Sequence, residues 1–467
     1  MACRCTWLPA CACAVAEGSC TGAVSPARPR IGQNAGVGLV GEGLAVATAP
    51  GPADMTALAR KAVRQALTQM GSTPNLVFVF VAATDAEDAE QALLAAHSQL
   101  PSATVLGTSA AGVIASGRGT DEGTAVAVWA ARIPGLRARS FHLEVMAAPD
   151  GHQIVGLPGR RRDDIIALLF TDPWSFPATD FAAHARVLLN DLPVVGAVAS
   201  GPAPARATRF LLDGRIHSRG AIGVMLGGHL EVTTLTSPAC RPVGPVLTVT
   251  DAEGFLLKSL AGSPAALRAQ EIVASLDEPE RALALSGLQL GVAVDSDDPR
   301  MGDFVIHEFQ AAEGERGALQ MIAQVPVGAT VQFHVRDEEA ADEDLNVTLE
   351  GVAARMGSRL EGALMFASTA RGRFMFGTRD HDAAVAHGRL AVPVTGFFAE
   401  AEMAPLGGEI CLNYQTATVV AIGAGPRAVV GHHVAVRPQQ VTGLDPMTRE
   451  VHKMLAELAH PPDEGEL

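Results

Sequence analysis

The feature of this chain that most restricts its fold is a strand-helix-strand pattern that occurs three times. Residues 76–113 begin with the apolar run LVFVFVAA, continue through the acid-rich helix pattern DAEDAEQALLAAH, and end after a proline-marked turn in TVLGTSAAGV. Residues 165–201 repeat this order, and residues 362–400 form a more divergent third copy. Uninterrupted apolar first strands are typical of strands that are buried on both faces. Each copy is therefore predicted to be a β-α-β unit whose helix covers a sheet.

Other strands are predicted between these units. They have alternating or β-branched patterns, as expected for antiparallel strands that extend each sheet. The segments are 124–133, 220–228, 230–237, 302–309 and 328–337. The predicted fold class is α+β, with repeated β-α-β units, added antiparallel strands and sheets covered by helices, in two related domains.

Helical patterns and changes in composition predict the domain limits. Ala- and Leu-rich segments interrupted by proline indicate a helical bridge in the middle of the chain. The predicted parts are a disordered cysteine-rich segment (1–40), an N-terminal domain (41–262), a helical linker (263–287), a C-terminal domain (288–424) and a tail (425–467) with a helix predicted over 444–460.

Charge and cysteine content restrict the partners and the compartment. A formal net charge of -15 without a basic stripe argues against nucleic acid, and apolar runs of about eight residues are too short to cross a bilayer. Two cysteines in the globular part, Cys240 and Cys411, cannot form a disulfide framework, which favours a cytoplasmic protein. The other five lie near the N-terminus: Cys3, Cys5, Cys11, Cys13 and Cys20. These could bind a soft metal, but the segment lacks hydrophobic periodicity, so no metal or cofactor is predicted.

The chain contains no strong catalytic motif. It has neither a phosphate-binding P-loop motif nor a His-Glu-x-x-His motif. The small-residue segments GTSAAG and GAVASG place Ser109 and Ser200 directly after predicted strands, where they could support a turn, line a ligand site or, less readily, act as nucleophiles. Cys240 precedes Arg241 in PACRPVG, and a buried, inert cysteine is favoured over a reactive thiolate.

Charged side chains gather in the segment FASTARGRFMFGTRDHDAAV, residues 366–385. Arg371 and Arg373 follow a predicted strand, and their forked donors suit a carboxylate or phosphate. Asp380 and His381 start the next helix, where they could bind a ligand, cap the helix or, less readily, hold a metal. Internal Arg-Asp pairing is the alternative to ligand binding.

Two acidic residues follow the last strand of the third unit. Glu400 and Glu402 are two positions apart in GFFAEAEMAP, so on a strand they would share a face. Such a pair could bind an amine, or it could form one polar edge of a strand.

Seven motifs in order resemble the FIST family, in which a FIST N domain precedes a FIST C domain. They are VLGTSAAGVIASG, LLFTDPWSFPATDF, VVGAVASG, CRPVGPVLTVTDAEG, GATVQFHVRD, RGRFMFGTRDHD and VPVTGFFAEAEMAP. The resemblance spans residues 41–422 and is greatest to stand-alone actinobacterial members. It implies a sensory input module that binds small ligands such as amino acids, and it provides no catalytic residues to transfer. Ser368 stands where relatives often carry cysteine, and Asn413-Tyr414 stand where a His-Gly pair is common.

Together these observations favour a cytoplasmic, bacterial sensor without its own output domain. The expected ligand is an amino acid or related small polar metabolite. It would be bound between the segments GTSAAG and GAVASG, the arginines Arg371 and Arg373, and the strand that carries Glu400 and Glu402. A signalling protein is the expected partner. An enzyme with a serine or cysteine nucleophile and a protein-interaction scaffold are the alternatives.

Overall fold

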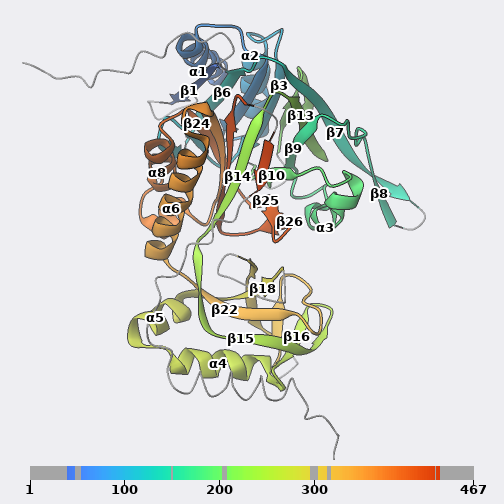
Figure 1. Cartoon of the computed structure of the whole chain (residues 1–467), viewed down its shortest axis with the longest axis vertical. Helices are drawn as coiled ribbons and strands as arrows, with labels where there is room; N and C mark the ends of the chain where they lie inside the picture. The colour runs from blue at the N-terminus through green and yellow to red at the C-terminus, as the bar shows by residue number, and fades with distance from the viewer. Residues whose placement is uncertain are drawn as a thin grey trace, which may run out of the picture. The chain divides into compact units, whose positions relative to one another are not determined.

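A computed structural model describes residues 39–47, 54–121, 123–148, 151–201, 208–294, 303–312, 317–425 and 428–431. These residues form four β-sheets with covering helices (Figure 1). The predictions for the cysteine-rich N-terminus before Leu39 and for the helix over 444–460 lie outside the described residues.

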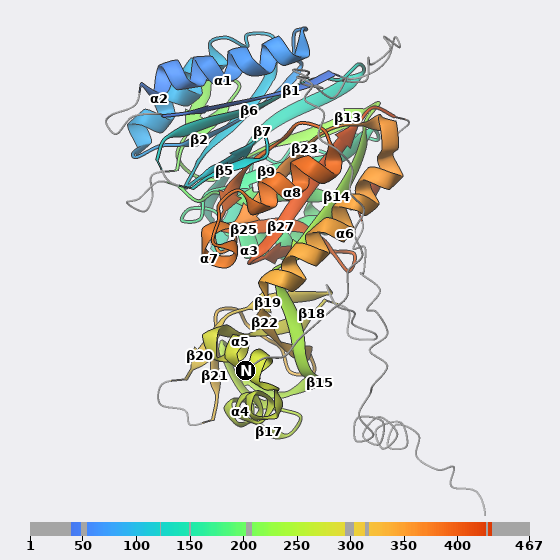
Figure 2. The same ribbon diagram turned by 90° about the vertical axis from the view of Figure 1, so that its left-hand side faces the viewer.

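The first β-α-β unit builds a six-stranded sheet in the order β1-β6-β2-β3-β11-β12. Its elements are β1 (Leu39–Val46), α1 (Met55–Met70), β2 (Leu76–Ala82), α2 (Ala86–His97), β3 (Thr104–Ala110), β6 (Ala125–Arg132), β11 (Phe210–Leu212) and β12 (Arg215–His217). β2 and β3 are parallel, with Leu76 opposite Thr104. Asp54 and Asp85 cap the two helices by accepting hydrogen bonds from first-turn N–H groups at 2.9 Å. The two helices lie on one face of this sheet (Figure 2).

The second unit builds a seven-stranded sheet in the order β26-β25-β10-β9-β13-β7-β8. Its elements are β7 (Leu136–Ala148), β8 (Gly151–Val155), β9 (Asp164–Thr171), α3 (Ala178–Leu188), β10 (Val194–Val198), β13 (Ala221–Gly228), β25 (Ala401–Leu406) and β26 (Glu409–Asn413). β9 and β10 are parallel, with Ala167 opposite Val194. β25 comes from much later in the chain and pairs with β10, with Ala401 opposite Val198.

The third unit builds a seven-stranded sheet in the order β28-β14-β27-β23-β24-β4-β5. Its elements are β4 (Val113–Ala115), β5 (Arg118–Thr120), β14 (Glu231–Pro238), α6 (Glu338–Met356), a 3-10 turn (Gly357–Arg359), β23 (Leu360–Ser368), α7 (Gly372–Phe376), α8 (His381–Leu390), β24 (Val394–Ala399), β27 (Thr416–Gly423) and β28 (Ala428–Gly431). β23 and β24 are parallel, with Ala363 opposite Val394. α6 and α8 pack side by side against this sheet (Figure 2). All three predicted β-α-β units are therefore confirmed.

The three sheets share one interior, to which each contributes phenylalanine. Phe80 of β2, Phe170 of β9 and Phe366 of β23 are fully buried and come from three different sheets. The Phe170 ring lies 5.8 Å from that of Phe80 and 5.6 Å from that of Phe366, both in edge-to-face geometry. Aromatic pairs favour this geometry because the positive edge of one ring meets the negative face of the other. Scarce aromatic residues are thus concentrated where the sheets meet.

A fourth, eight-stranded sheet contains none of the three units. Its elements, with covering helices, are β15 (Cys240–Glu253), β16 (Leu256–Leu260), β17 (Ser263–Pro264), α4 (Ala265–Ser275), α5 (Glu278–Gly287), β18 (Leu288–Ala293), β19 (Phe304–His307), β20 (Phe309–Ala311), β21 (Leu319–Met321) and β22 (Thr330–Arg336). Of the five predicted antiparallel strands, β6, β13 and β14 join the sheets of the units as expected. The segments 302–309 and 328–337 instead pair within the fourth sheet, because β18 and β15 supply their partners.

Strand pairing crosses the predicted division of the chain. The predicted linker, 263–287, coincides with α4 and α5, which pack on the fourth sheet. β25 and β26 belong to the second sheet, and β14 belongs to the third. The α+β class is confirmed, whereas the limits 41–262 and 288–424 stay a prediction that the sheets do not follow.

None of the helices in the described ranges is both long and apolar enough to cross a membrane. The predicted cytoplasmic location stays a prediction.

His334 on β22 predicts a pH dependence of stability. Its side chain is 2 % exposed, and burial lowers its pKa from 6.5 to about 4. At a pH between these two pKa values, the unfolded chain binds a proton at His334 and the folded chain does not. Lowering the pH through this range therefore lowers the free energy of unfolding. Relative to His334→Gln, the wild type should lose roughly 2 to 3 kcal/mol between pH 7.5 and 4.5, measured by urea unfolding. A wild-type-to-variant difference that stays constant with pH would contradict this prediction.

Candidate functional site

A cavity of about 620 Å³ lies at the carboxyl ends of the parallel strands β9 and β10. The loop after β9, the first turn of α3 and the bend between β24 and β25 contribute to its wall. Three aromatic residues, Trp174, Phe176 and Tyr414, stand in this wall with two carboxylates, Asp180 and Glu400. The crevice beyond the carboxyl ends of parallel strands is the usual place for ligands in sheets of this kind. We call it the first cavity.

Side-chain hydrogen bonds fix the loop that carries Trp174. Asp172 Oδ2 accepts hydrogen bonds from the backbone N–H groups of Trp174 and Ser175 at 3.3 and 2.9 Å and from the Ser175 hydroxyl at 2.6 Å. The Ser175 hydroxyl accepts a further bond from Gly220 N at 2.8 Å. Trp174 nevertheless remains 58 % exposed. The backbone that carries this large aromatic side chain is therefore fixed at the wall of the cavity, and the side chain is left open to contact a ligand.

Glu400 lies where the chain passes from the third sheet to the second. β24 ends at Ala399 and β25 begins at Ala401, and the N–H of Glu400 donates to Val198 O at 3.1 Å. Burial raises the pKa of Glu400. A cation in the first cavity would favour the ionised form and lower that pKa again. Among the described residues that line the first cavity there is no lysine, arginine or histidine.

The first turn of α3 gives the same cavity hydrogen-bond donors. α3 begins at Ala178 after Pro177, and no side chain caps its N-terminus. Ala178 and Thr179 line the cavity, and the Ala178 N–H donates to Phe176 O at 2.9 Å. The first N–H groups of a helix lack partners within the helix and carry its partial positive charge, which favours an anion. The first cavity thus offers carboxylates to a cation and the backbone N–H of Thr179 to an anion.

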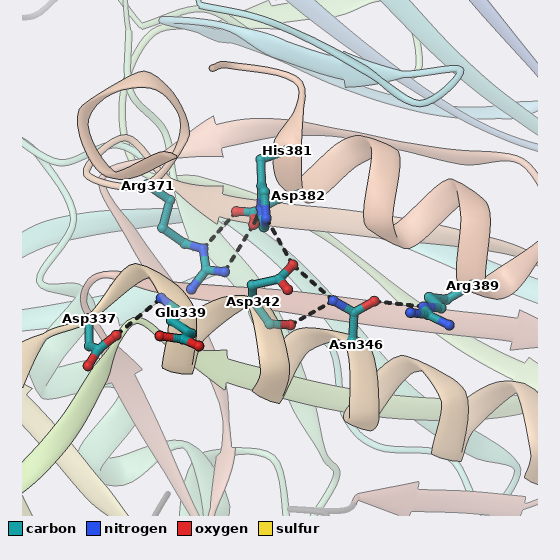
Figure 3. Close-up of polar contacts among 8 residues, drawn as sticks. All are labelled: Asp337, Glu339, Asp342, Asn346, Arg371, His381, Asp382 and Arg389. Carbon is teal, nitrogen blue, oxygen red and sulfur yellow. Dashed lines mark hydrogen bonds and ion pairs between the residues drawn. The ribbon is translucent and has the colours of Figure 1, made fainter. Parts of the chain in front are cut away.

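A separate buried polar network lies against the third sheet (Figure 3). Arg371, which follows β23, is fully buried, and its Nε and Nη2 donate to the two carboxylate oxygens of Asp382 at 2.6 and 3.0 Å. Burial opposes ionisation of Asp382, but the charges of Arg371 and His381 outweigh it and hold the pKa at about 2. The Arg371 guanidinium is thus committed to an internal ion pair.

His381 extends this network to α6. Its Nδ1 lies 3.0 Å from Asp382 Oδ1, and its Nε2 lies 3.0 Å from Asp342 Oδ1 (Figure 3). The imidazole also stacks on the Phe376 ring, with centroids 3.6 Å apart. These contacts join α6, α7 and α8 around the buried arginine.

Family models match most of this chain. The FIST N domain model matches residues 75–263, and the FIST C domain model matches residues 265–405. An uncharacterized protein of Mycobacterium bovis is 36 % identical over 381 residues, which cover 81 % of this chain and 97 % of that protein. An uncharacterized protein of Mycobacterium tuberculosis H37Rv is also 36 % identical over 381 residues, covering 81 % of this chain and 98 % of the relative.

The chain belongs to the FIST family. FIST domains are sensory domains, which fits a role in signal transduction. The first cavity contains residues from both domains, since Trp174 and Asp180 lie in the FIST N match and Glu400 lies in the FIST C match. Tyr414 follows the matched region. A ligand in this cavity would therefore contact both parts of the FIST pair.

Eight residues are predicted from the sequence to bind the ligand. Of these, only Glu400 is among the described residues that line the first cavity. The buried Ser109 hydroxyl accepts a hydrogen bond from Arg209 N at 2.9 Å. The buried Ser200 hydroxyl accepts from Ala111 N at 3.0 Å and donates to the Phe398 carbonyl. Both serine hydroxyls thus join neighbouring segments of the chain through hydrogen bonds to the backbone.

Arg373 and Asp380 contact residues 119–121, in and directly after β5, in the FIST N part. Arg373 Nη2 lies 3.8 Å from Asp121 Oδ1, and Gly119 N donates to Asp380 Oδ1 at 2.8 Å. Asp380 occupies the N-cap position of α8, yet its side chain makes no cap hydrogen bond. The charged segment 366–385 therefore joins parts of the chain in this structure, as its alternative interpretation held.

Glu400 and Glu402 do not share a face, so that expectation is wrong. Glu400 lies in the bend between two strands, whereas Glu402 is within β25 and fully buried. Thr416 donates a hydrogen bond to Glu402 Oε2, and Oε1 has no partner among the described residues. Burial raises the pKa of Glu402 well above its ordinary value. Glu402 is therefore part of the interior.

Sequence reasoning missed three residues of the first cavity: Trp174, Asp180 and Tyr414. The first two lie in DPWSFPATD, whose two prolines between a strand and a helix mark a rigid loop at the carboxyl end of the strand. Tyr414 is the only tyrosine of the chain. The two prolines could have indicated a rigid loop at the carboxyl end of a strand, where ligands often bind. Nothing in the sequence placed Tyr414 beside this loop.

Cys240 is a structural side chain. Its thiol donates to Gln289 Oε1 at 2.9 Å, and burial raises its pKa to about 12. A thiol with this pKa is protonated at neutral pH and is a poor nucleophile. Within the described ranges, no group of three or more His, Cys, Asp or Glu side chains is arranged to hold a metal ion.

Proposed function

We propose that this protein is a sensor that binds a small amine-bearing ligand, such as an amino acid, in the first cavity and transmits the signal to another protein. The observation that carries the proposal is the combination of Glu400 and Asp180 with aromatic walls in one cavity of about 620 Å³. Carboxylates and aromatic faces both attract an ammonium group. The volume is within the range of small-molecule sites.

The first turn of α3 supports an amino acid within this ligand class. A ligand ammonium beside Glu400 would leave its carboxylate to the N–H group of Thr179, because the Ala178 N–H already donates to Phe176 O at 2.9 Å. The sequence-based hypothesis gave the carboxylate to Arg371 and Arg373. This proposal moves it to the helix terminus because Arg371 is already paired with Asp382.

Glu400→Gln should weaken amine binding about 10- to 100-fold, as expected for the loss of a charge-assisted hydrogen bond. A thermal-shift screen of amino acids, amines, carboxylates and nucleotides identifies a binder, and calorimetry then compares the variant with the wild type. A binder at a hundred times its dissociation constant adds about 2.7 kcal/mol of stability. Because burial raises the pKa of Glu400, wild-type affinity should increase as the pH rises through that value and the carboxylate ionises.

Glu350→Gln is the matched control. Glu350 is on α6, half-exposed and paired with Arg389, away from the first cavity. The Glu350→Gln variant should bind the amine with the same affinity as the wild type. Equal affinities in the wild type and Glu400→Gln would remove the first cavity as the site, and no shift with any amine would favour the scaffold hypothesis.

A further inference from the structure

A second cavity of about 670 Å³ adjoins the first. The two cavities have four wall residues in common: Thr179, Asp180, Leu412 and Tyr414. The second cavity continues along α3 to Ala183 and is completed by residues of the fourth sheet and its loops. Shared wall residues place the two cavities side by side in one structure.

The wall of the second cavity is mainly apolar. Ile322 and Phe255 face it and are 53 % and 47 % exposed, so large apolar surface is left open to water in a concave place. Val292 and Val305 add aliphatic surface. His307 also lines the cavity, and burial lowers its pKa to about 4, which keeps the imidazole neutral. The described lining residues include no lysine or arginine.

Tyr414 marks the boundary between the two cavities. It lines both, and its hydroxyl is hydrogen-bonded to Thr179, which also lines both. Glu400 and Trp174 belong to the first cavity and not to the second. Glu400 therefore lies on the first side of Tyr414 alone, whereas Asp180 lines both cavities and the second side adds the aliphatic surface of Val292 and Ile322.

We propose that one amphiphilic ligand occupies both cavities, with its ammonium group at Glu400 and an unbranched aliphatic chain extending past Tyr414 into the second cavity. The inference rests on the proposed function and specifies the ligand class as an amine or amino acid with a long apolar chain. Charge complementarity positions the polar end, because Glu400 lies on one side of Tyr414. Removal of apolar surface from water favours the chain on the other side.

The test uses the full chain and straight-chain α-amino acids from 2-aminobutyrate to 2-aminodecanoate, with dissociation constants measured by calorimetry. Each added methylene should tighten binding about fourfold until the second cavity is filled. In Ile322→Glu, which places a charge on the apolar wall, the long members should lose this gain while the shortest member binds as to the wild type. Ala183→Trp, at an exposed position of α3, should remove the same gain by filling the cavity.

Leu285→Glu is the matched control, because Leu285 is 75 % exposed on α5 and does not line either cavity. It should keep the wild-type dependence on chain length. An affinity that does not change with chain length overturns the second-cavity inference and leaves the proposed function standing. The second-cavity inference is also overturned if Ile322→Glu and Ala183→Trp both keep the increase in affinity with chain length. Failure of every member to bind the wild type overturns the proposed function together with this inference.

Discussion

Asp382→Ala should lower the free energy of unfolding by about 3 to 5 kcal/mol, since it leaves the guanidinium of Arg371 buried without its counter-ion. Arg371 and Asp382 are 0 % and 2 % exposed at their side chains and make two hydrogen bonds to each other. Water cannot replace the lost carboxylate at such a site. Urea unfolding at neutral pH, followed by circular dichroism, measures the loss.

The control for this prediction is Glu350→Ala. Glu350 pairs with Arg389, but those side chains are 56 % and 45 % exposed, so the change should cost no more than about 1 kcal/mol. Similar losses in the two variants would mean that the buried pair has no special role. Asp382→Asn, which keeps the shape but removes the charge, should fall between the alanine variant and the wild type.

Phe170→Ala should also lower the free energy of unfolding by about 3 to 5 kcal/mol, through lost apolar contacts and a residual cavity. Phe170, on β9 of the second sheet, is fully buried and contacts aromatic rings of the first and third sheets. Neighbours held in two other sheets cannot easily collapse into the space. Denaturant unfolding of the variant and the wild type gives the value directly.

Phe374→Ala makes the same chemical change at a side chain that is 86 % exposed. It should alter the free energy of unfolding by no more than about 0.5 kcal/mol. A loss below about 1 kcal/mol in Phe170→Ala would contradict the interpretation of the shared core.

The two-part first cavity suggests how sensing depends on the FIST N and FIST C pair. Trp174 and Asp180 come from one domain and Glu400 from the other, and the β10-β25 pairing holds the two sides together. A ligand that contacts both sides stabilises that arrangement by its own binding free energy. A partner protein that recognises this arrangement would receive the signal, which extends the proposed function.

Local sequence determined much of the fold. Each β-α-β unit contains a continuous apolar strand, a helix with small apolar residues on one face, and a second strand after a short turn. Such patterns predict parallel pairs because only a sheet buried on both faces accommodates them. The observed registers of β2 with β3, β9 with β10, and β23 with β24 confirm all three.

The candidate site could be predicted only in part. Sequence reasoning named Glu400, which lines the first cavity, but it did not assign the loop that bears Trp174 to a ligand site. It also assigned Arg371 to a ligand, whereas the structure pairs Arg371 with Asp382. An arginine suited to an external carboxylate is equally suited to an internal one, and sequence alone does not distinguish the two.

The sequence by itself determined the α+β class, the three units, the FIST resemblance and the expectation of a sensor. Tertiary structure decided which strands meet across long separations: β25 beside β10, Tyr414 beside Thr179, and a fourth sheet that takes up β19 and β22. The physical reason is that hydrophobic periodicity specifies which face of a strand is buried but not which edge it pairs with. Both cavities lie between segments joined in this way, so their walls appear only in the folded chain.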